Sequence, residues 1–393
     1  MTGNGTSNSS VSGGSSTTST SSGGSSSGET TTTGSTDTLS TSSTSSTSST
    51  GATDTDGTTD TEGTTDTDDT EGFVPHTYEC VPVGDSYNDG FFALREFKDQ
   101  LYAGVFGYGD EDKSMVYRFA PWELTSPGLL GVGESICALL EWEGYLYANT
   151  ENSGFIARTA DGLNWETVYD GTSGAIGCGL AASGDALYAV SYNYGTHQDA
   201  KILRTTNGAD WDVVWSGGQN SWYIREITFH DGAVHAFYIE EDSNNGFRLT
   251  STNGLDWETH PTPSRFFRAT SWKKDLWIGS TNSRSNGVSG VWRVPAGGDL
   301  NAPELVHAGE KSYVTELAAW DGRLWAATAD GWKDDNGTST LIAMSDPSGD
   351  NWETICEFPE VSAWAVAPAG DNLYVGTWQY GKGGKVYEVR IVE

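Results

Sequence analysis

Short apolar strands recur along the chain at a spacing of roughly 45 residues. The clearest copy begins Leu101-Tyr102-Ala103-Gly104, and equivalent stretches begin at Leu146, Leu187, Val234, Leu276, Leu324 and Leu373. Most copies follow another short apolar run and a Gly- or Asp-bearing turn, and each precedes a variable loop, a third strand, a corner and a fourth strand. Four strands in each of seven units predict an all-β fold, a seven-bladed β-propeller of four-stranded blades.

The two ends of the folded region are expected to complete one unit between them. The seventh unit has no fourth strand after residues 386–389, whereas an unassigned strand at 77–81 precedes the first unit. We expect this N-terminal strand to pair beside 386–389 and close the ring, which removes the open edges of a linear array. Loss of either end is then predicted to unfold the domain.

A second signature marks the corners before several fourth strands. Thr159-Ala160-Asp161-Gly162-Leu163-Asn164-Trp165 is followed by similar stretches at 205–211 and 251–257, each 46 residues after the last, and by a looser copy at 345–352. Asp or Asn followed by Gly supplies the positive φ of a tight hairpin, Ser or Thr bonds back into the turn, and Trp begins the next strand as an apolar wedge.

These corners resemble the Asp-box, or bacterial neuraminidase repeat, whose pattern is roughly Ser-x-Asp-x-Gly-x-x-Trp. Most copies here are one residue shorter, and Asp161 keeps the family's acid. The resemblance implies a β-propeller with the boxes away from any catalytic face. It argues against a sialidase, because the chain has no Arg-Ile-Pro motif and most of its arginines fall on third strands. Xyloglucanase-like relatives pair two propellers around a cleft, and one is predicted here.

Composition divides the chain at residue 72. Residues 1–72 are almost wholly Ser, Thr, Gly and Asp, with ten acidic residues and no basic or aromatic ones, which predicts a disordered acidic tether. Residues 73–393 are the predicted propeller, with 44 acidic and 21 basic residues and a net charge of −23. That charge excludes nucleic acid and anionic membranes as partners.

A Ser/Thr/Gly tether ahead of a β domain is typical of an exported bacterial surface protein or lipoprotein. We therefore expect an extracellular or cell-surface monomer. Residues 1–72 contain no signal peptide, so the export signal and any lipid anchor to the membrane are expected to be absent from this chain. Cys137 and Cys178 occupy equivalent places on neighbouring inner strands and could form a disulfide or stay as buried thiols, whereas Cys80 and Cys356 are expected to be free. No zinc spacing is present.

Aromatic residues outside the repeat phase are predicted to form a ligand-binding loop face. They suit stacking on sugar rings or gripping a protein loop, and neighbouring carboxylates could hold calcium; no other cofactor is predicted. Alternatively, these are ordinary solvated loops. The residues are Tyr108, Tyr192, Tyr194, Trp222, Tyr223, Trp332, Trp378 and Tyr380.

A charged triad is predicted near the propeller axis. Eight residues before the repeated Leu or Val, successive units carry Glu226, Arg268 and Glu316 where the other four carry Ala or Gly. An unpaired charge there would be costly, so we expect Arg268 to bridge both carboxylates, either as a structural triad or as the acid and base of a neutral-polysaccharide hydrolase. The favoured function is a non-enzymatic binding module for a glycan or protein, with the hydrolase as the alternative.

Overall fold

The computed structural model describes residues 76–85, 90–107, 115–120, 123–129, 135–151, 154–171, 175–193, 198–218, 221–240, 246–282, 287–331, 337–346 and 348–392. The predicted tether lies outside them. Every element of these residues is a β-strand, and no helix in them is long and apolar enough to span a membrane.

The strands follow one another in antiparallel meanders, because short apolar runs alternate with turns. The first two meanders are β2 (Gly90–Phe97), β3 (Gln100–Phe106), β4 (Met115–Ala120) and β5 (Glu123–Leu129), then β6 (Ser135–Trp142), β7 (Tyr145–Glu151), β8 (Ile156–Thr159) and β9 (Trp165–Tyr169). The next two are β10 (Ala175–Ile176) with β11 (Leu180–Ser183), β12 (Ala186–Asn193), β13 (Gln198–Thr205) and β14 (Asp212–Ser216), then β15 (Ser221–His230), β16 (Ala233–Glu240), β17 (Gly246–Ser251) and β18 (Glu258–Thr262).

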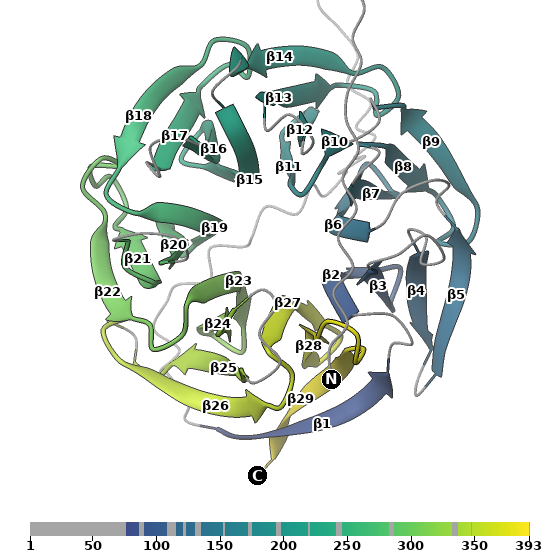
Figure 1. The fold of residues 1–393 in the computed structure, drawn as a ribbon, viewed down its shortest axis with the longest axis vertical. Helices are drawn as coiled ribbons and strands as arrows, with labels where there is room; N and C mark the ends of the chain where they lie inside the picture. Colours follow the sequence, from purple (N-terminus) through teal and green to yellow (C-terminus); the bar gives the residue numbers. More distant parts are fainter. Residues whose placement is uncertain are drawn as a thin grey trace, which may run out of the picture. The chain divides into compact units, whose positions relative to one another are not determined.

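The remaining meanders repeat the same pattern. They are β19 (Arg265–Trp272), β20 (Asp275–Thr281), β21 (Gly290–Val294) and β22 (Glu304–Ala308), then β23 (Tyr313–Trp320), β24 (Arg323–Ala329), β25 (Ser339–Met344) and β26 (Trp352–Phe358), and finally β27 (Ser362–Ala369), β28 (Asn372–Trp378) and β29 (Lys385–Val392). The meanders lie around a common centre, with the first strand of each nearest to it (Figure 1).

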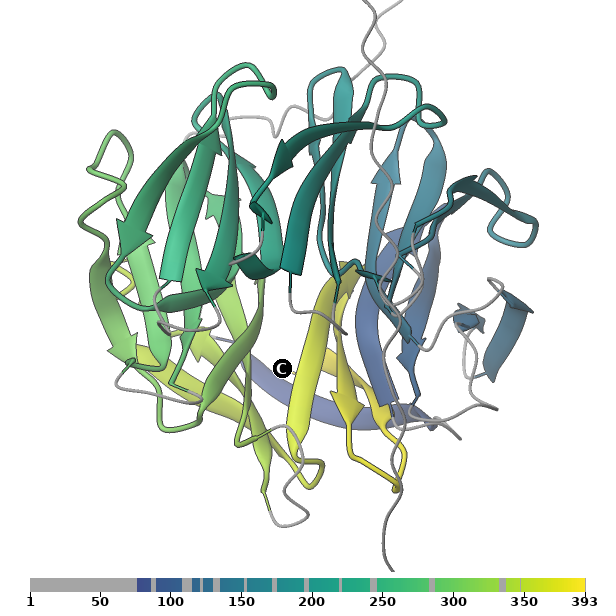
Figure 2. The same cartoon turned by 45° about the horizontal axis from the view of Figure 1, so that its top comes forward.

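The N-terminal strand β1 (Thr77–Asp85) pairs antiparallel with the C-terminal strand β29, with Cys80 opposite Val389. It runs along the outer edge of the last meander and on towards β26 (Figures 1 and 2). Pairing of the 77–81 segment beside 386–389 is therefore present as predicted.

A disulfide joins β1 to the neighbouring meander, between Cys80 and Cys356 of β26, with Cα atoms 6.4 Å apart. The prediction that these two cysteines are free is wrong. β1 reaches past its own meander to the neighbouring one, where the Tyr78 ring packs edge-on against Trp325 with centroids 4.9 Å apart. Cys137 and Cys178 are buried free thiols.

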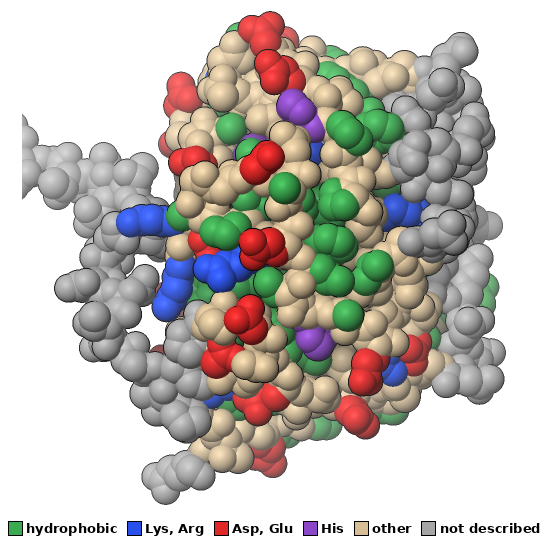
Figure 3. All heavy atoms as spheres, turned by 90° about the vertical axis from the view of Figure 1, so that its left-hand side faces the viewer, with side chains coloured by type: hydrophobic (Ala, Val, Ile, Leu, Met, Phe, Trp, Pro, Cys, Tyr) green, Lys and Arg blue, Asp and Glu red, His purple; other side chains and the backbone are tan. Residues whose placement is uncertain are grey.

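The apolar core lies between neighbouring meanders and at the centre. Each interface buries branched and aromatic side chains from facing sheets, as a propeller-like arrangement requires. On the side over β18, β21 and β22, acidic side chains are scattered and a few basic ones gather at one edge (Figure 3). That side has no concentrated charge of one sign.

Candidate functional site: the central well

A bulge turns one side chain of each inner strand towards the centre. The register against the second strand shifts between Phe91 and Ala93, and at the equivalent place in five further meanders, so one extra residue stands out of each ladder. In the remaining meander the equivalent residue lies in the break between β10 and β11. We call these residues the floor layer: Phe92, Cys137, Cys178, Arg225, Phe267, Thr315 and Trp364.

The floor layer meets across the axis and is buried throughout. Phe92 stacks on Trp364 with centroids 4.6 Å apart, and Trp364 meets Phe267 edge-on at 5.8 Å. The Arg225 guanidinium lies 5.0 Å from the Phe267 centroid, and its Nη1 donates to Cys178 Sγ at 3.5 Å. These contacts close the centre at the level of the bulges.

A cavity of about 310 Å³ lies against the floor layer, and we call it the central well. Its lining starts at Phe92, Cys137 and Cys178 and continues along the inner strands to Arg95, Thr270 and Pro368. These last residues lie near the ends of β2, β19 and β27, so the well extends towards the hairpins between first and second strands.

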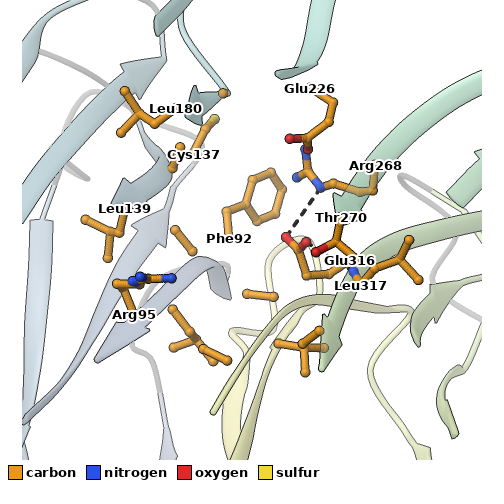
Figure 4. Close-up of a pocket in the computed structure, with 18 of the residues that line it drawn as sticks. Phe92, Arg95, Cys137, Leu139, Leu180, Glu226, Arg268, Thr270, Glu316 and Leu317 are labelled. Atoms are coloured by element: carbon orange, nitrogen blue, oxygen red, sulfur yellow. Dashed lines mark hydrogen bonds and ion pairs between the residues drawn. The ribbon is translucent and has the colours of Figure 1, made fainter. Parts of the chain in front are cut away.

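One wall of the well is charged and the other is mostly apolar. Glu226, Arg268 and Glu316 line one side, and Leu139 and Leu180 line the opposite side with Phe92 between them (Figure 4). Arg95 also lies on the apolar side (Figure 4). The well therefore combines a polar wall with a hydrophobic one, as ligand sites commonly do.

The charged wall is the predicted triad, and the prediction that Arg268 bridges both carboxylates is confirmed. Arg268 Nη1 lies 3.4 Å from Glu226 Oε2, and Arg268 Nε lies 3.4 Å from Glu316 Oε2. The Arg268 side chain is 4% exposed, whereas Glu226 is 14% and Glu316 29% exposed. The carboxylates thus reach the well while the guanidinium stays behind them.

Burial changes the acidity of both carboxyl groups. Desolvation raises the pKa of Glu226 to about 8; Arg268 opposes the rise and the nearby Glu316 charge adds to it. Desolvation also raises the pKa of Glu316, again against the influence of Arg268. Glu226 can therefore hold a proton near neutral pH.

Two of the predicted ligand-binding aromatics belong to the core. Trp378 is 0% exposed and meets Phe106 edge-on with centroids 5.8 Å apart, and Tyr192 is also buried. Their expected exposure is wrong. Trp378 ends β28 opposite Gly90 of the next inner strand, and its ring also meets Phe92 edge-on with centroids 6.0 Å apart.

Of the other predicted aromatics, Tyr380 is the one whose side chain the structure describes. Tyr380 is 46% exposed. Tyr108, Tyr194 and Trp332 lie outside the described residues, as do the side chains of Trp222 and Tyr223 on β15. Within the described part of the chain, no group of three or more His, Cys, Asp or Glu side chains could hold a metal ion.

The sequence pattern did not predict that the seven floor-layer residues form one cluster. Each member stands nine residues before its repeated Leu or Val, so the phase was available in the sequence. The residues share no chemical type, however, and no sequence signal in an apolar strand predicts the bulge that turns them towards the axis.

No family model and no curated protein matches this chain. Among solved structures, a streptogramin B lyase aligns with a TM-score of 0.57 at 10% identity, covering 80% of this chain and 98% of its own. A catalytically inactive virginiamycin B lyase from Staphylococcus aureus with quinupristin aligns at 0.57 and 13% identity, covering 80% and 100%. YCF48 bound to a D1 peptide aligns at 0.54 and 13% identity, covering 82% and 99%.

These similarities establish the fold alone. The chain has a propeller-like all-β fold.

Proposed function

We propose that this protein is a non-enzymatic binding module whose central well receives a basic side chain from a protein partner. The single observation that carries the proposal is the open charged wall: two carboxylates and one guanidinium line the cavity, and the guanidinium lies behind them. With both carboxylates ionised the triad has a net charge of −1, which an arriving guanidinium or ammonium group would neutralise. The apolar wall would hold the aliphatic part of the same side chain.

A protein partner is favoured over a glycan by the distribution of aromatic rings. Sugar recognition needs exposed rings for stacking. Of the predicted aromatics whose side chains the structure describes, Tyr192 and Trp378 are packed in the core and Tyr380 alone is exposed. YCF48, which is similar in fold, carries a bound D1 peptide. Glycan binding through Tyr108, Tyr194, Trp222, Tyr223, Trp332 and Tyr380 remains the competing form of the proposal.

The number of blades, the closure of the ring and the repeat family also belong to what we propose. We infer a seven-bladed propeller, because each repeated Leu or Val is the second residue of the second strand of its own meander. We also infer that β1 closes the ring beside β29. Membership of the Asp-box family is supported by corner bonds: Asp161 Oδ1 accepts from the amides of Leu163 and Asn164, and Asn207 Oδ1 accepts from those of Ala209 and Asp210.

An extracellular or cell-surface location fits the chemistry of this chain. The Cys80–Cys356 disulfide supports an oxidising compartment, and the acidic Ser/Thr/Gly segment suits a tether from a surface anchor. We propose that the propeller acts there as a monomer.

The hydrolase remains the second candidate, because the raised pKa of Glu226 supports it. A glycosidase needs one protonated and one ionised carboxyl group, and a pKa of about 8 would keep Glu226 protonated as the acid. The binding module is preferred because Arg268 contacts both carboxylates and ties each to the wall.

The test uses N-acetyl-arginine amide, with N-acetyl-citrulline amide as its neutral isostere, measured by calorimetry, and then an array of short peptides that each carry a single Arg. We expect the arginine probe to bind and the citrulline probe not to bind. Glu226→Gln with Glu316→Gln should weaken binding by about 30-fold or more, since losing a buried charge partner costs about 2 kcal/mol or more. Arg95→Gln is the matched control: it removes a cation from the opposite wall and should not weaken binding.

Proton linkage gives a second readout. A cation binds the ionised form of Glu226, so affinity should rise between about pH 6 and about pH 8, and Glu226→Gln should remove much of this rise. Equal binding of the arginine and citrulline probes would overturn the proposal. A parallel array of neutral glycans tests the competitors: retention on glycans supports the sugar form, and release of reducing ends that stops in Glu226→Gln supports the hydrolase.

A further inference from the structure

The floor of the central well contains a pair of thiols that the triad does not use. Cys137 and Cys178 occupy the same place on neighbouring inner strands, and both line the well. Each is buried, at 5% and 2% exposure, and neither takes part in the disulfide. A small ion in the well would therefore meet two sulfur atoms at its floor.

The two sulfurs have neighbours of opposite charge. Arg225 Nη1 lies 3.5 Å from Cys178 Sγ, and the Cys137 thiol points to Glu151 Oε2 at 3.9 Å. Burial raises the pKa of Cys137 well above its usual range, and a hydrogen bond with Cys178 contributes to the rise. Cys137 is thus a thiol, with the Glu151 carboxylate beside it and the Arg225 guanidinium beside Cys178.

We propose that Cys137 and Cys178 form a two-sulfur site for a soft monovalent cation, Cu⁺. Thiolates select Cu⁺ over the hard cations Ca²⁺ and Mg²⁺. Structural zinc sites need four ligands, and no group of three or more His, Cys, Asp or Glu in the described part of the chain could hold a metal. Two sulfurs without further ligands suit an ion that is satisfied by two-coordinate binding.

The binding step balances in protons and charge. Each thiol loses its proton, two protons leave, and one Cu⁺ joins both sulfurs to give a dithiolate complex with a net charge of −1. The copper keeps its oxidation state. The Arg225 guanidinium, 3.5 Å from Cys178 Sγ, offsets part of the negative charge of the complex, and the Phe92, Phe267 and Trp364 rings pack at the same level of the floor.

The test begins with a count of thiols in the full chain, unfolded without reductant. Two reactive thiols are expected, and none would overturn the proposal, because the pair would then be a second disulfide. Cu⁺ is next titrated anaerobically against bicinchoninate, with the stoichiometry checked by native mass spectrometry. We expect one Cu⁺ per chain, and no transfer from the competitor would overturn the site.

Variants assign the ligands. Cys137→Ser and Cys178→Ser should each abolish stoichiometric Cu⁺ uptake, while Cys80→Ser with Cys356→Ser should leave it intact. Arg225→Gln should weaken Cu⁺ binding by about 10- to 100-fold, as loss of a group that contacts a metal ligand does, and Arg225→Lys should restore part of the loss. Copper uptake that survives in the Cys137→Ser, Cys178→Ser double variant, or Zn²⁺ bound as tightly as Cu⁺, would contradict the proposal.

Discussion

At the scale of single residues, the triad is built around one buried guanidinium. Arg268 Nε also donates to Thr315 O at 2.7 Å, and Nη1 donates to Arg225 O at 3.2 Å, so the guanidinium is fixed by backbone as well as by carboxylates. Since the loss of hydration at Glu226 outweighs the attraction of Arg268, its carboxyl group favours the neutral form. At high pH, where Glu226 must ionise in this buried position, the triad therefore lowers the free energy of unfolding.

The pH dependence of unfolding should reveal this cost. Glu226 has a pKa of about 8 when folded against 4.5 ordinarily, so the folded state binds the extra proton. Its stabilising contribution is complete below about pH 4.5 and is lost as the pH rises to about 8. Urea unfolding of Glu226→Gln and wild type should give a difference in unfolding free energy that changes steadily across this window, in favour of the variant at high pH.

The comparison with Glu226→Gln separates this effect from other titrations. The pKa values of His230, His235 and His307 are lowered by burial, so these groups add stability as the pH rises through the acid side of the same window. They are present in both proteins and cancel in the difference. A difference that does not vary with pH would contradict the raised pKa of Glu226.

Single residues were predictable from the sequence where the repeat phase decides their place. Glu226, Arg268 and Glu316 share an offset on successive inner strands, and equal offsets put them side by side. Trp378 was predicted to be an exposed loop residue, because it follows the apolar part of its strand. It is instead the last residue of β28, pairs with Gly90 of the neighbouring inner strand and is buried. The position of a residue within the repeat predicts which strand it lies on. Packing between meanders, which the repeat does not encode, decides whether its side chain is exposed.

At the scale of elements, the two repeated signatures fit into each other. A Cβ at Gly162 would clash with the Tyr102 hydroxyl, one at Gly208 with Tyr147, and one at Gly254 with Tyr188. Each corner glycine therefore rests on the second-strand tyrosine of the preceding meander. Its φ, between +72° and +75°, also lies in the left-handed region. The corner thus needs glycine for both its turn and its contact.

Alanine substitution should separate the turn from the contact. Gly232 has a φ of +76° and open space around its Cβ position, so Gly232→Ala should cost about 1–2 kcal/mol of unfolding free energy from backbone strain alone. Gly254→Ala adds the clash with Tyr188 and should cost about 2–5 kcal/mol, measured by chemical denaturation.

A double-mutant cycle checks the contact. Tyr188→Phe removes the hydroxyl that meets Gly254, so the combined variant should recover part of the loss. Equal costs for Gly232→Ala and Gly254→Ala would show that the hydroxyl contact is unimportant.

Elements were the most predictable level. Period-two apolar strands and Gly-bearing turns are local signals, and the strands of the described residues begin where these signals place them. The fit of tyrosine under glycine could not be predicted, because it links residues of neighbouring meanders that share no local pattern.

At the scale of the whole molecule, the N-terminal strand is held by three kinds of contact. β1 forms backbone pairs with β29 from Thr77 to Asp85, Tyr78 Oη donates to Asp321 Oδ2 at 2.6 Å, and the disulfide joins Cys80 to Cys356. The pairing could be predicted from a missing strand at one end and a spare one at the other. The disulfide could not, because it depends on how far β1 extends over the next meander.

Cys80→Ser with Cys356→Ser should lower the unfolding free energy by about 2–5 kcal/mol, since the bridge spans 276 residues and constrains the unfolded chain. Wild type treated with dithiothreitol should match the variant, and Cys137→Ser with Cys178→Ser, which leaves the bridge intact, is the control.

Deleting residues 76–85 removes the backbone pairing as well and should abolish cooperative thermal unfolding, followed by circular dichroism. If that deletion left a cooperative transition within a few degrees of the wild type, β1 would be an accessory strand and not the element that completes the ring.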